Sequence, residues 1–412
     1  MADNTPFLQG INYWPIHKAM YWWKNFDPNE VNRDFSLLQQ HGFKLVRIFL
    51  TWEDFQPRPD LISPAALEHL ATTMDIAWRH GLQIMPTFFC GHMSGVNWMP
   101  AWMLTDYSAP QPFDIYAGGV IYTDRALRDC YSDEAVIEAQ ALQIASVCQH
   151  VHGHQSLYGY DLGNENSNFA IPPDRERARG WLDVMTSTIR SYSPGMPVTI
   201  GMHSEDLEQD RRMWPQDVAR YCDYLCMHGY PSYLAWVKDP FDAHALPFLA
   251  TVTEWMGGKP VLLEEFGAPT CENDQERAET AVLSLFPLFE EKSVKDFYQR
   301  ALTLLQQEHI LGALAWCFAD YHPHLWDRPP LDRRIHERYF GLFRSDHSPK
   351  PALEAFKTQR LYEPAPEKVE KRHPWLQDYD REDFYSDPIG NLSAMYEQYR
   401  LHKGLEPQLA NK

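Results

Sequence analysis

Short apolar runs recur along the chain, and amphipathic stretches separate most of them. Eight runs are typical of buried strands in a parallel sheet; they cover residues 7–13, 43–49, 82–89, 157–162, 198–202, 224–227, 261–264 and 312–317. The stretches between them repeat apolar residues at three- and four-residue steps, as helices that face a core do; the clearest are 30–41, 64–80, 133–150, 175–193, 243–255 and 293–309. This alternation predicts an α/β fold, a (β/α)8 TIM barrel.

Signals at the ends of the predicted helices agree with this alternation. His41-Gly42 and His80-Gly81 each place a cation and then Gly just before a strand, as a connection from helix to strand does. Ser63-Pro64 has a capping hydroxyl followed by Pro at the first helical position. A doubly wound nucleotide-binding sheet would need a Gly-rich loop after its first strand, and Asn12-Tyr13-Trp14-Pro15 contains none.

Two long segments follow predicted strands on the side where barrels build their sites. They are 90–129, rich in Trp, Met, Pro and Tyr, and 322–338, which contains Trp326. We expect a catalytic barrel over residues 1–360, closed by a last helix at 352–360. Residues 361–412 would form an extension with a helix at 391–403.

The extension is charged and contains aromatic residues, which argue for docking onto a surface; they are Tyr362, Trp375, Phe384 and Tyr385. Three roles stay open for it: an ordered strap, a contact in a homo-oligomer, or a partly disordered tail. We see no internal repeat and no low-complexity tract.

Composition narrows the classes of function. Among 412 residues, 37 are Lys or Arg and 56 are Asp or Glu, so the formal charge of −19 disfavours nucleic acid as a partner. The first six residues lack the features of an export signal, and no apolar run reaches the roughly 18 residues that a membrane span needs. The seven cysteines are scattered and odd in number, which suits reduced thiols. We therefore expect a cytoplasmic protein with no membrane partner.

Two glutamates carry the candidate chemistry. Glu165 ends the fourth predicted strand segment and Glu265 ends the seventh. In an eight-stranded barrel those strands lie on nearly opposite sides of the mouth, so two carboxylates can face one bound sugar. Such a pair is what glycosidic bond cleavage requires, with about 5–5.5 Å between the groups in retaining enzymes and roughly 6.5–9.5 Å in inverting ones.

The surroundings of these glutamates resemble a known family. Asn164-Glu165 and Glu265-Phe266-Gly267 are similar to the acid/base and nucleophile motifs of clan A retaining glycoside hydrolases, family 5 in particular. The resemblance extends over about residues 7–358 and implies roles for further residues. Arg47 would hold the nucleophile, and Asn164 would bind the sugar 2-hydroxyl. His228 and Tyr230 would form a His-x-Tyr motif. Trp316 would form the floor of the sugar subsite.

The resemblance implies a division of labour between the two carboxylates. Glu265, kept ionised by Arg47, would attack the anomeric carbon, while Glu165, with a raised pKa, would act as acid and then as base. Adjacent strand residues point to opposite faces, so Glu264 would face the helix layer or pair with a basic residue. No metal and no cofactor is expected; His150, His152 and His154 are interpreted as surface residues at a helix end.

Three further segments are similar to subfamily 18 of family 5. They are 11–15, which contains Asn12; 52–57, which contains Trp52; and 91–95, which contains His92. These three residues and Trp326 complete the candidate substrate contacts. This resemblance implies an exo-acting β-mannosidase for small oligosaccharides such as Manβ1,4GlcNAc. The alternatives are an exo-glucosidase, an endo-acting mannanase or cellulase, a non-catalytic carbohydrate-binding barrel, and an assembly component that acts through its tail.

Overall fold

The computed structural model describes residues 7–283, 286–358 and 373–408, and its centre is a parallel eight-stranded sheet. Its strands are β1 (Leu8–Tyr13), β2 (Leu45–Thr51), β3 (Gln83–Cys90), β10 (Tyr160–Asn164), β11 (Val198–Gly201), β12 (Leu225–His228), β13 (Val261–Phe266) and β14 (Gly312–Ala315). β1 pairs with β14, and a bridge between His203 and His228 joins the edges at β11 and β12. The sheet is thus a barrel, and the predicted fold class is confirmed.

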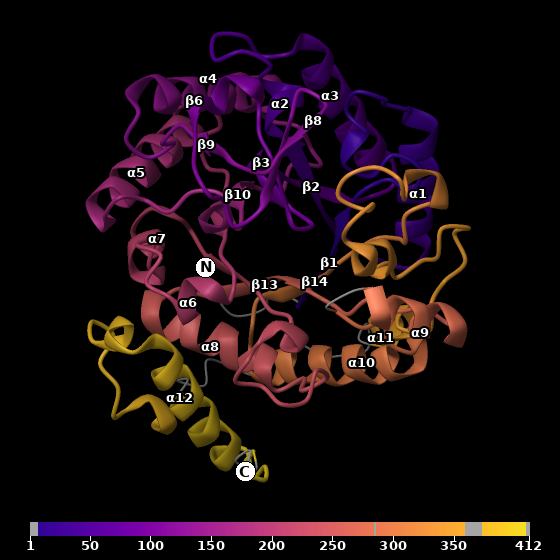
Figure 1. Cartoon of the computed structure of the whole chain (residues 1–412), viewed down its shortest axis with the longest axis vertical. Helices are drawn as coiled ribbons and strands as arrows, with labels where there is room; N and C mark the ends of the chain where they lie inside the picture. Colours follow the sequence, from indigo (N-terminus) through magenta and orange to yellow (C-terminus); the bar gives the residue numbers. More distant parts are fainter. Residues whose placement is uncertain (1–6, 284–285, 359–372, 409–412) are drawn as a thin grey trace.

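Helices surround the strands (Figure 1). The larger ones are α1 (Pro28–Gln40), α3 (Pro64–Arg79), α4 (Glu134–Val151), α5 (Arg175–Tyr192), α7 (Pro215–Tyr221), α8 (Ala245–Gly257), α9 (Asp274–Leu283) and α10 (Glu291–Gln307), followed by the short α11 (Leu353–Thr358). Ser63 caps α3 as expected, because its Oγ accepts the backbone N–H of Ala66. Sequence periodicity missed α7, whose seven residues are too few for a clear helical repeat.

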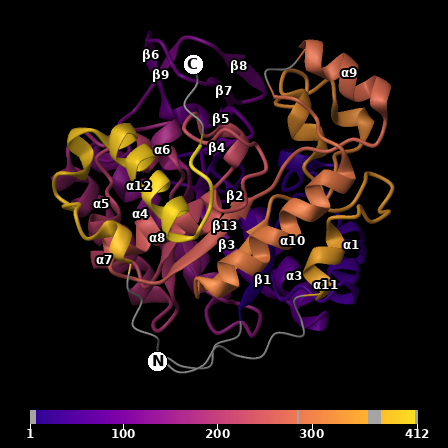
Figure 2. The same ribbon diagram turned by 90° about the horizontal axis from the view of Figure 1, so that it is seen from below.

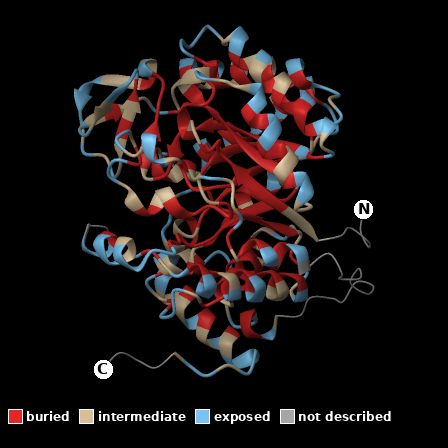
Figure 3. Cartoon of the chain, turned by 90° about the vertical axis from the view of Figure 1, so that its right-hand side faces the viewer, coloured by how far each residue is buried: buried red, intermediate tan, exposed pale blue. Residues whose placement is uncertain are grey.

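Buried residues concentrate in the strands and in the inward faces of the helices (Figure 3). Every residue of β2, β10, β11, β12, β13 and β14 is buried. This explains why the strands are continuous apolar runs, since both faces of a parallel sheet are covered. Among the described residues, no helix is long and apolar enough to cross a membrane.

The long segment after β3 contains strands that the sequence did not predict. Four of them make one small sheet, β4 (His92–Met93), β5 (Val96–Trp98), β7 (Asp114–Ala117) and β8 (Val120–Tyr122), and β6 (Leu104–Ser108) pairs with β9 (Arg125–Leu127). The segment after β14 contains only short turns of 3-10 helix, at Pro323–Leu325 and Ile335–Tyr339. Both segments extend above the carboxyl ends of the strands and wall the site described below.

The described part of the extension packs against the barrel as a strap. Helix α12 (Pro388–His402) lies beside α8 (Figure 2). Tyr396 donates from Oη to Asp242 Oδ2 at 2.7 Å, and the ring of Trp375 lies 5.6 Å from that of Phe248.

Other parts of the predicted extension cannot be placed. The end of the predicted last helix at 359–360 and the docking residue Tyr362 lie outside the described residues. The division of the chain at residue 360 therefore stays a proposal, as does any contact in a homo-oligomer.

Candidate active site

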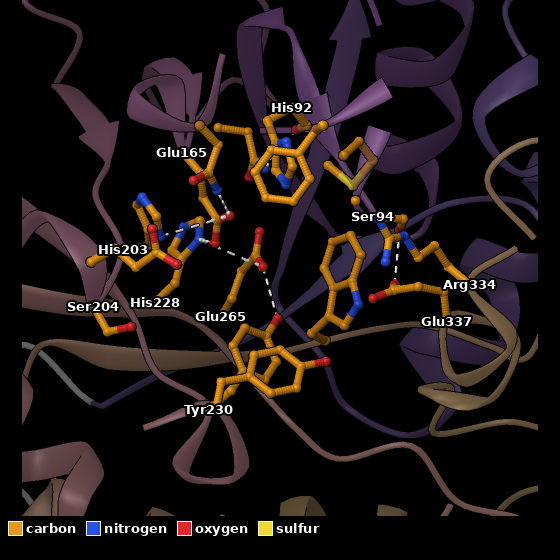
Figure 4. Close-up of a pocket in the computed structure, with 18 of the residues that line it drawn as sticks. His92, Ser94, Glu165, His203, Ser204, His228, Tyr230, Glu265, Arg334 and Glu337 are labelled. Carbon is orange, nitrogen blue, oxygen red and sulfur yellow. Dashed lines mark hydrogen bonds and ion pairs between the residues drawn. The ribbon is translucent and has the colours of Figure 1, made fainter. Parts of the chain in front are cut away.

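A pocket of about 310 Å³ opens at the carboxyl ends of the strands (Figure 4). Its lining comes from the segments after β3, β10, β11, β12, β13 and β14, which is where barrels place their sites. The polar residues that line it are His92, Ser94, Asn164, Glu165, Asn168, His203, Ser204, Glu205, Glu208, His228, Tyr230, Tyr233, Glu265, Arg334, His336 and Glu337. Met93, Phe113, Phe286, Trp316 and Phe340 supply its apolar walls.

Arg47 lies beneath this pocket with 0% of its surface exposed. Its Nη1 donates to Glu265 Oε1 at 2.6 Å and to Asn12 Oδ1 at 3.2 Å. Its Nη2 donates to Asp161 Oδ2 at 2.7 Å and to Asn164 Oδ1 at 2.9 Å. Arg47 therefore joins the ends of β1, β10 and β13 through one guanidinium.

The charges around Arg47 keep it protonated. Burial by itself would lower the pKa of Arg47, but the carboxylates of Glu264, Asp161 and Glu265 outweigh burial and raise that pKa. Burial and the neighbouring Glu264 also raise the pKa of Asp161, to about 6, against the opposing effect of Arg47. The network is thus a set of buried charges that only their mutual pairing makes tolerable.

Glu264 does not face the helix layer, which was one of the two arrangements expected for it. Its Oε2 lies 3.4 Å from Arg47 Nη2 and 3.1 Å from His228 Nε2, inside the barrel. The pairing register shifts here: Met227 pairs with Leu263, but the next residue, His228, pairs with Glu265. The extra residue is a β-bulge, which re-aims side chains. Both glutamates therefore reach Arg47. For Glu264, the structure thus shows the other expected arrangement, in which it pairs with a basic residue.

Glu265 receives hydrogen bonds on both carboxylate oxygens. Arg47 donates to Oε1, and Tyr230 donates from Oη to Oε2 at 2.8 Å. Only 4% of Glu265 is exposed, and burial raises its pKa against the opposing effects of His228 and Arg47. The expected influence of Arg47 is present, but burial and the nearby Glu165 outweigh it.

Glu165 directly follows β10 in a left-handed backbone conformation, with φ of +49°. Such conformations are costly for residues with a Cβ and cluster at functional sites. Its Oε2 accepts from Asn168 Nδ2 at 3.0 Å, and its Oε1 lies 2.9 Å from His228 Nδ1. One oxygen of Glu165 and one of Glu265 lie within 4.8 Å of each other.

The prediction that Glu165 has a raised pKa is wrong for this structure. Burial does raise it, but His203, His228 and His92 outweigh burial and lower the pKa of Glu165 below its ordinary value. The pKa of His228 moves the other way: burial would lower it, but Glu265, Glu165 and Glu264 raise it to about 10. An imidazolium thus lies between the two candidate catalytic carboxylates.

The remaining predicted site residues divide into three groups. Asn164, His92 and Trp316 line the pocket with the two glutamates. Asn12 lies behind it and positions Arg47. Trp52 and Trp326 do not line the pocket.

Both tryptophans pack in the loop walls instead. Trp52 is fully buried, donates to Gln56 Oε1 at 3.0 Å and packs against Trp102. Trp326 donates to the backbone oxygen of Tyr321 at 3.0 Å, and the guanidinium of Arg338 covers its ring. Trp is highly buried on average, so a Trp near the end of a strand can serve the core as well as a sugar site.

Sequence reasoning missed several residues of the site. Asp161 carried a usable signal, because a carboxylate inside an apolar run requires a buried partner. His203, Glu205 and Glu337 carried none, since they come from loops whose paths the apolar pattern does not determine.

Comparison with known proteins gives one family and several similar structures. The family model for "Glycosyl hydrolases family 2, TIM barrel domain" matches residues 118–364. The β-glucuronidase of Sus scrofa is 26% identical over 234 residues, which cover 53% of this chain and 32% of that protein. The β-glucuronidase of Felis catus is 25% identical over 226 residues, 54% of this chain and 30% of that protein. The chain thus spans about a third of the length of the curated relatives it matches.

Solved structures cover more of the fold. A protein described as GH5_18 from Streptomyces cattleya, in complex with GlcNAc, is 22% identical with a TM-score of 0.76, over 98% of this chain and 92% of that one. The exo-β-1,4-mannosidase Op5Man5 from an Opitutaceae bacterium is 26% identical with a TM-score of 0.69, over 86% of this chain and 59% of that one. The barrel of a glycosidase is therefore established, while the narrower placement in family 5 stays a proposal.

The Arg47 network generates a prediction about stability. Arg47→Met should lower the free energy of unfolding by about 3–5 kcal/mol, because it leaves buried carboxylates without their cation. Urea denaturation followed by tryptophan fluorescence measures this. The control is Arg58→Met, since Arg58 pairs with Asp60 on the surface and should contribute little. Equal urea midpoints for Arg47→Met and wild type would contradict the account.

Proposed function

The chain belongs to the glycosyl hydrolases family 2 TIM barrel domain family, and on that premise we propose that it is a retaining exo-β-mannosidase. Its substrates would be small oligosaccharides with a terminal β-mannose, such as Manβ1,4GlcNAc. The observation that carries the proposal is the pair of Glu165 and Glu265 at the base of one pocket, with oxygens within 4.8 Å of each other. That approach favours retention over inversion, which needs room for a water molecule between the two groups.

The hydrogen bonds favour Glu265 as nucleophile. Arg47 and Tyr230 hold both of its oxygens and stabilise the ionised form. Glu265 attacks the anomeric carbon while the bond from that carbon to the glycosidic oxygen breaks and Glu165 protonates the leaving oxygen. Glu165 then removes a proton from water, which attacks the same carbon and releases Glu265.

The pKa shift of Glu165 in the empty pocket means that a proton must reach this residue before the first step. The histidines around Glu165 keep it ionised beside the imidazolium of His228. His228 Nδ1 lies 2.9 Å from Glu165 Oε1 and can donate its proton to that oxygen. When the sugar enters, His228 gives its Nδ1 proton to Glu165. The acid is then protonated, His228 is neutral, and Arg47 and Tyr230 hold the nucleophile in its ionised form.

The charges of the pocket favour a neutral sugar. Besides the catalytic pair, Glu205, Glu208 and Glu337 line it, against two cations, the guanidinium of Arg334 and the imidazolium of His228. An anionic sugar would meet a mostly acidic wall, which costs Coulomb energy at short range. Support for mannose comes from two similar structures, the exo-β-1,4-mannosidase Op5Man5 and a GH5_18 variant in complex with Manb1-4GlcNAc.

A β-glucuronidase is the second candidate. The curated relatives carry that name, and Arg334 is a cation that could pair with a sugar carboxylate. The mannosidase proposal predicts that Arg334 does not serve this purpose. A cytoplasmic location, a small-sugar partner and a reaction without cofactors stay predictions from the sequence.

A panel of aryl glycosides tests the substrate. We expect kcat/KM for aryl β-mannoside to exceed that for aryl β-glucoside and aryl β-glucuronide by at least about 100-fold, because a site built to bind one sugar leaves its polar groups unpaired with another. Manβ1,4GlcNAc should be cleaved to mannose and GlcNAc. A preference for the glucuronide that Arg334→Met abolishes would replace this proposal with the second candidate.

Substitution of the two glutamates tests their roles. Glu265→Ala should lower kcat by at least about 10⁴-fold on every substrate, because no covalent intermediate can form. Glu165→Ala should lower kcat by about 10²–10⁴-fold on substrates with poor leaving groups. It should largely spare activated aryl mannosides, with azide restoring turnover. Glu176→Ala, an exposed site on α5, is the control. An unaffected Glu265→Ala enzyme would refute the assignment.

The pH dependence tests the proton transfer from His228 to Glu165. Its pKa is raised to about 10, so the imidazolium is present below that value and is lost as the pH rises through it. The alkaline limb of kcat/KM should therefore lie near pH 10. In His228→Asn the limb should move to lower pH, and kcat should fall more on poor leaving groups than on activated ones. Identical pH profiles for the two enzymes would contradict this transfer.

A further inference from the structure

Three histidines from the first and last barrel loops meet outside the pocket. His17 follows β1, while His322 and His324 follow β14. The ring centroid of His322 lies 4.8 Å from that of His17 and 4.7 Å from that of His324. Each ring offers one nitrogen, and these three nitrogens lie within 4.8 Å of one another. None of the three lines the catalytic pocket.

The hydrogen bonds of His324 fix its tautomer. Its Nε2 lies 2.9 Å from the backbone oxygen of His17, and that oxygen can only accept, so Nε2 carries the hydrogen. In a neutral imidazole the other nitrogen then has a free lone pair. Histidines that bind metals are oriented in this way, with the second ring N–H donated to a backbone carbonyl or a carboxylate.

The other nitrogen of His324 faces a ring nitrogen of His322. Its Nδ1 lies 2.7 Å from His322 Nδ1, which accepts the backbone N–H of His324. Without an ion, one of the two nitrogens carries a hydrogen and donates it to the other; when both lose that hydrogen, their lone pairs face one space that a cation can occupy. Two nitrogens on tetrahedral zinc, each at 2.0–2.1 Å, lie about 3.4 Å apart. The pair would need to open by well under an ångström, which rotation of the partly exposed rings allows.

We propose that His17, His322 and His324 form a binding site for a divalent transition metal ion of the zinc class, with water as a fourth ligand. Neutral imidazoles suit zinc, copper and nickel, whereas magnesium and calcium prefer oxygen ligands. The site is distinct from catalysis, for which the sequence predicts no metal. All three rings are at least partly exposed, so an ion can reach them from solution.

The position of the cluster gives the ion a mechanical role. β1 and β14 are the first and last strands of the barrel and pair with each other. The loop that carries His322 and His324 continues to Arg334 and Glu337, which line the catalytic pocket. An ion at the cluster would fasten this loop to the segment after β1. It would therefore hold one wall of the pocket in place.

Metal binding is measured on the full chain after treatment with a chelator. Equilibrium dialysis against Zn²⁺ with an excess of Mg²⁺ should give one zinc ion per chain. Co²⁺ in place of Zn²⁺ should give the visible absorption of a tetrahedral site. Zinc at about 100 times its Kd should raise the Tm by roughly 3 °C, because the ion binds only the folded chain.

Single substitutions assign the ligands. His322→Ala and His324→Ala should each abolish the bound ion, the cobalt absorption and the rise in Tm. His17→Ala tests the third ligand in a different loop, in case the His322 turn is disturbed. The control is His152→Ala, an exposed histidine between α4 and β10, which should bind as the wild type does. A wild type without bound zinc, or the same zinc content in all variants, would overturn the proposal.

A second readout connects the ion to the pocket and rests on the proposed function. Removal of zinc should raise KM for Manβ1,4GlcNAc several-fold and leave kcat nearly unchanged, since only a binding wall loosens. Equal KM values with and without zinc would overturn the mechanical role. If the protein cleaves no sugar on the panel, dialysis and cobalt absorption still decide whether the site exists.

Discussion

The guanidinium of Arg47 is the interaction on which the site depends. Moving a charge out of water costs several kcal/mol even in a relaxed protein, so a buried Arg persists only with nearby carboxylates in good geometry. Asp161, Glu264 and Glu265 supply them from β10 and β13. The same contacts set the position of the proposed nucleophile. The side chain of Arg47 therefore does two things at once: it balances the buried carboxylates and it positions the proposed nucleophile.

The bulge in β13 is what makes this compensation feasible. A regular strand would turn either Glu264 or Glu265 out of the barrel, because successive side chains alternate between faces. The added residue lets both carboxylates point at Arg47, and His228 then bridges Glu264 to Glu165. A local irregularity in one strand thus couples the structural charges beneath the pocket to the candidate acid above it.

Sequence alone could predict the barrel and the strand ends, and the reasons for its failures are physical. Period and burial indicate where a strand ends, so the positions of Glu165 and Glu265 near strand ends were predictable. The bulge at Glu264 has no signature in the apolar pattern, because it shifts the register without changing residue type. The pKa of Glu165 depends on His203 and His92, which come from loops far apart in sequence. The buried position of Trp52 could not be predicted for a simpler reason, since its ring suits the core and a sugar site equally well.

The chemistry of the pocket also explains why the acid/base assignment cannot rest on the empty site. Before a sugar binds, the histidines around Glu165 favour its ionised form. This preference must reverse in the state that reacts, because the acid needs its proton. The imidazolium of His228, 2.9 Å from Glu165, holds a proton that can make this change without altering the net charge of the pair. The pocket can therefore begin catalysis without importing a proton from solvent.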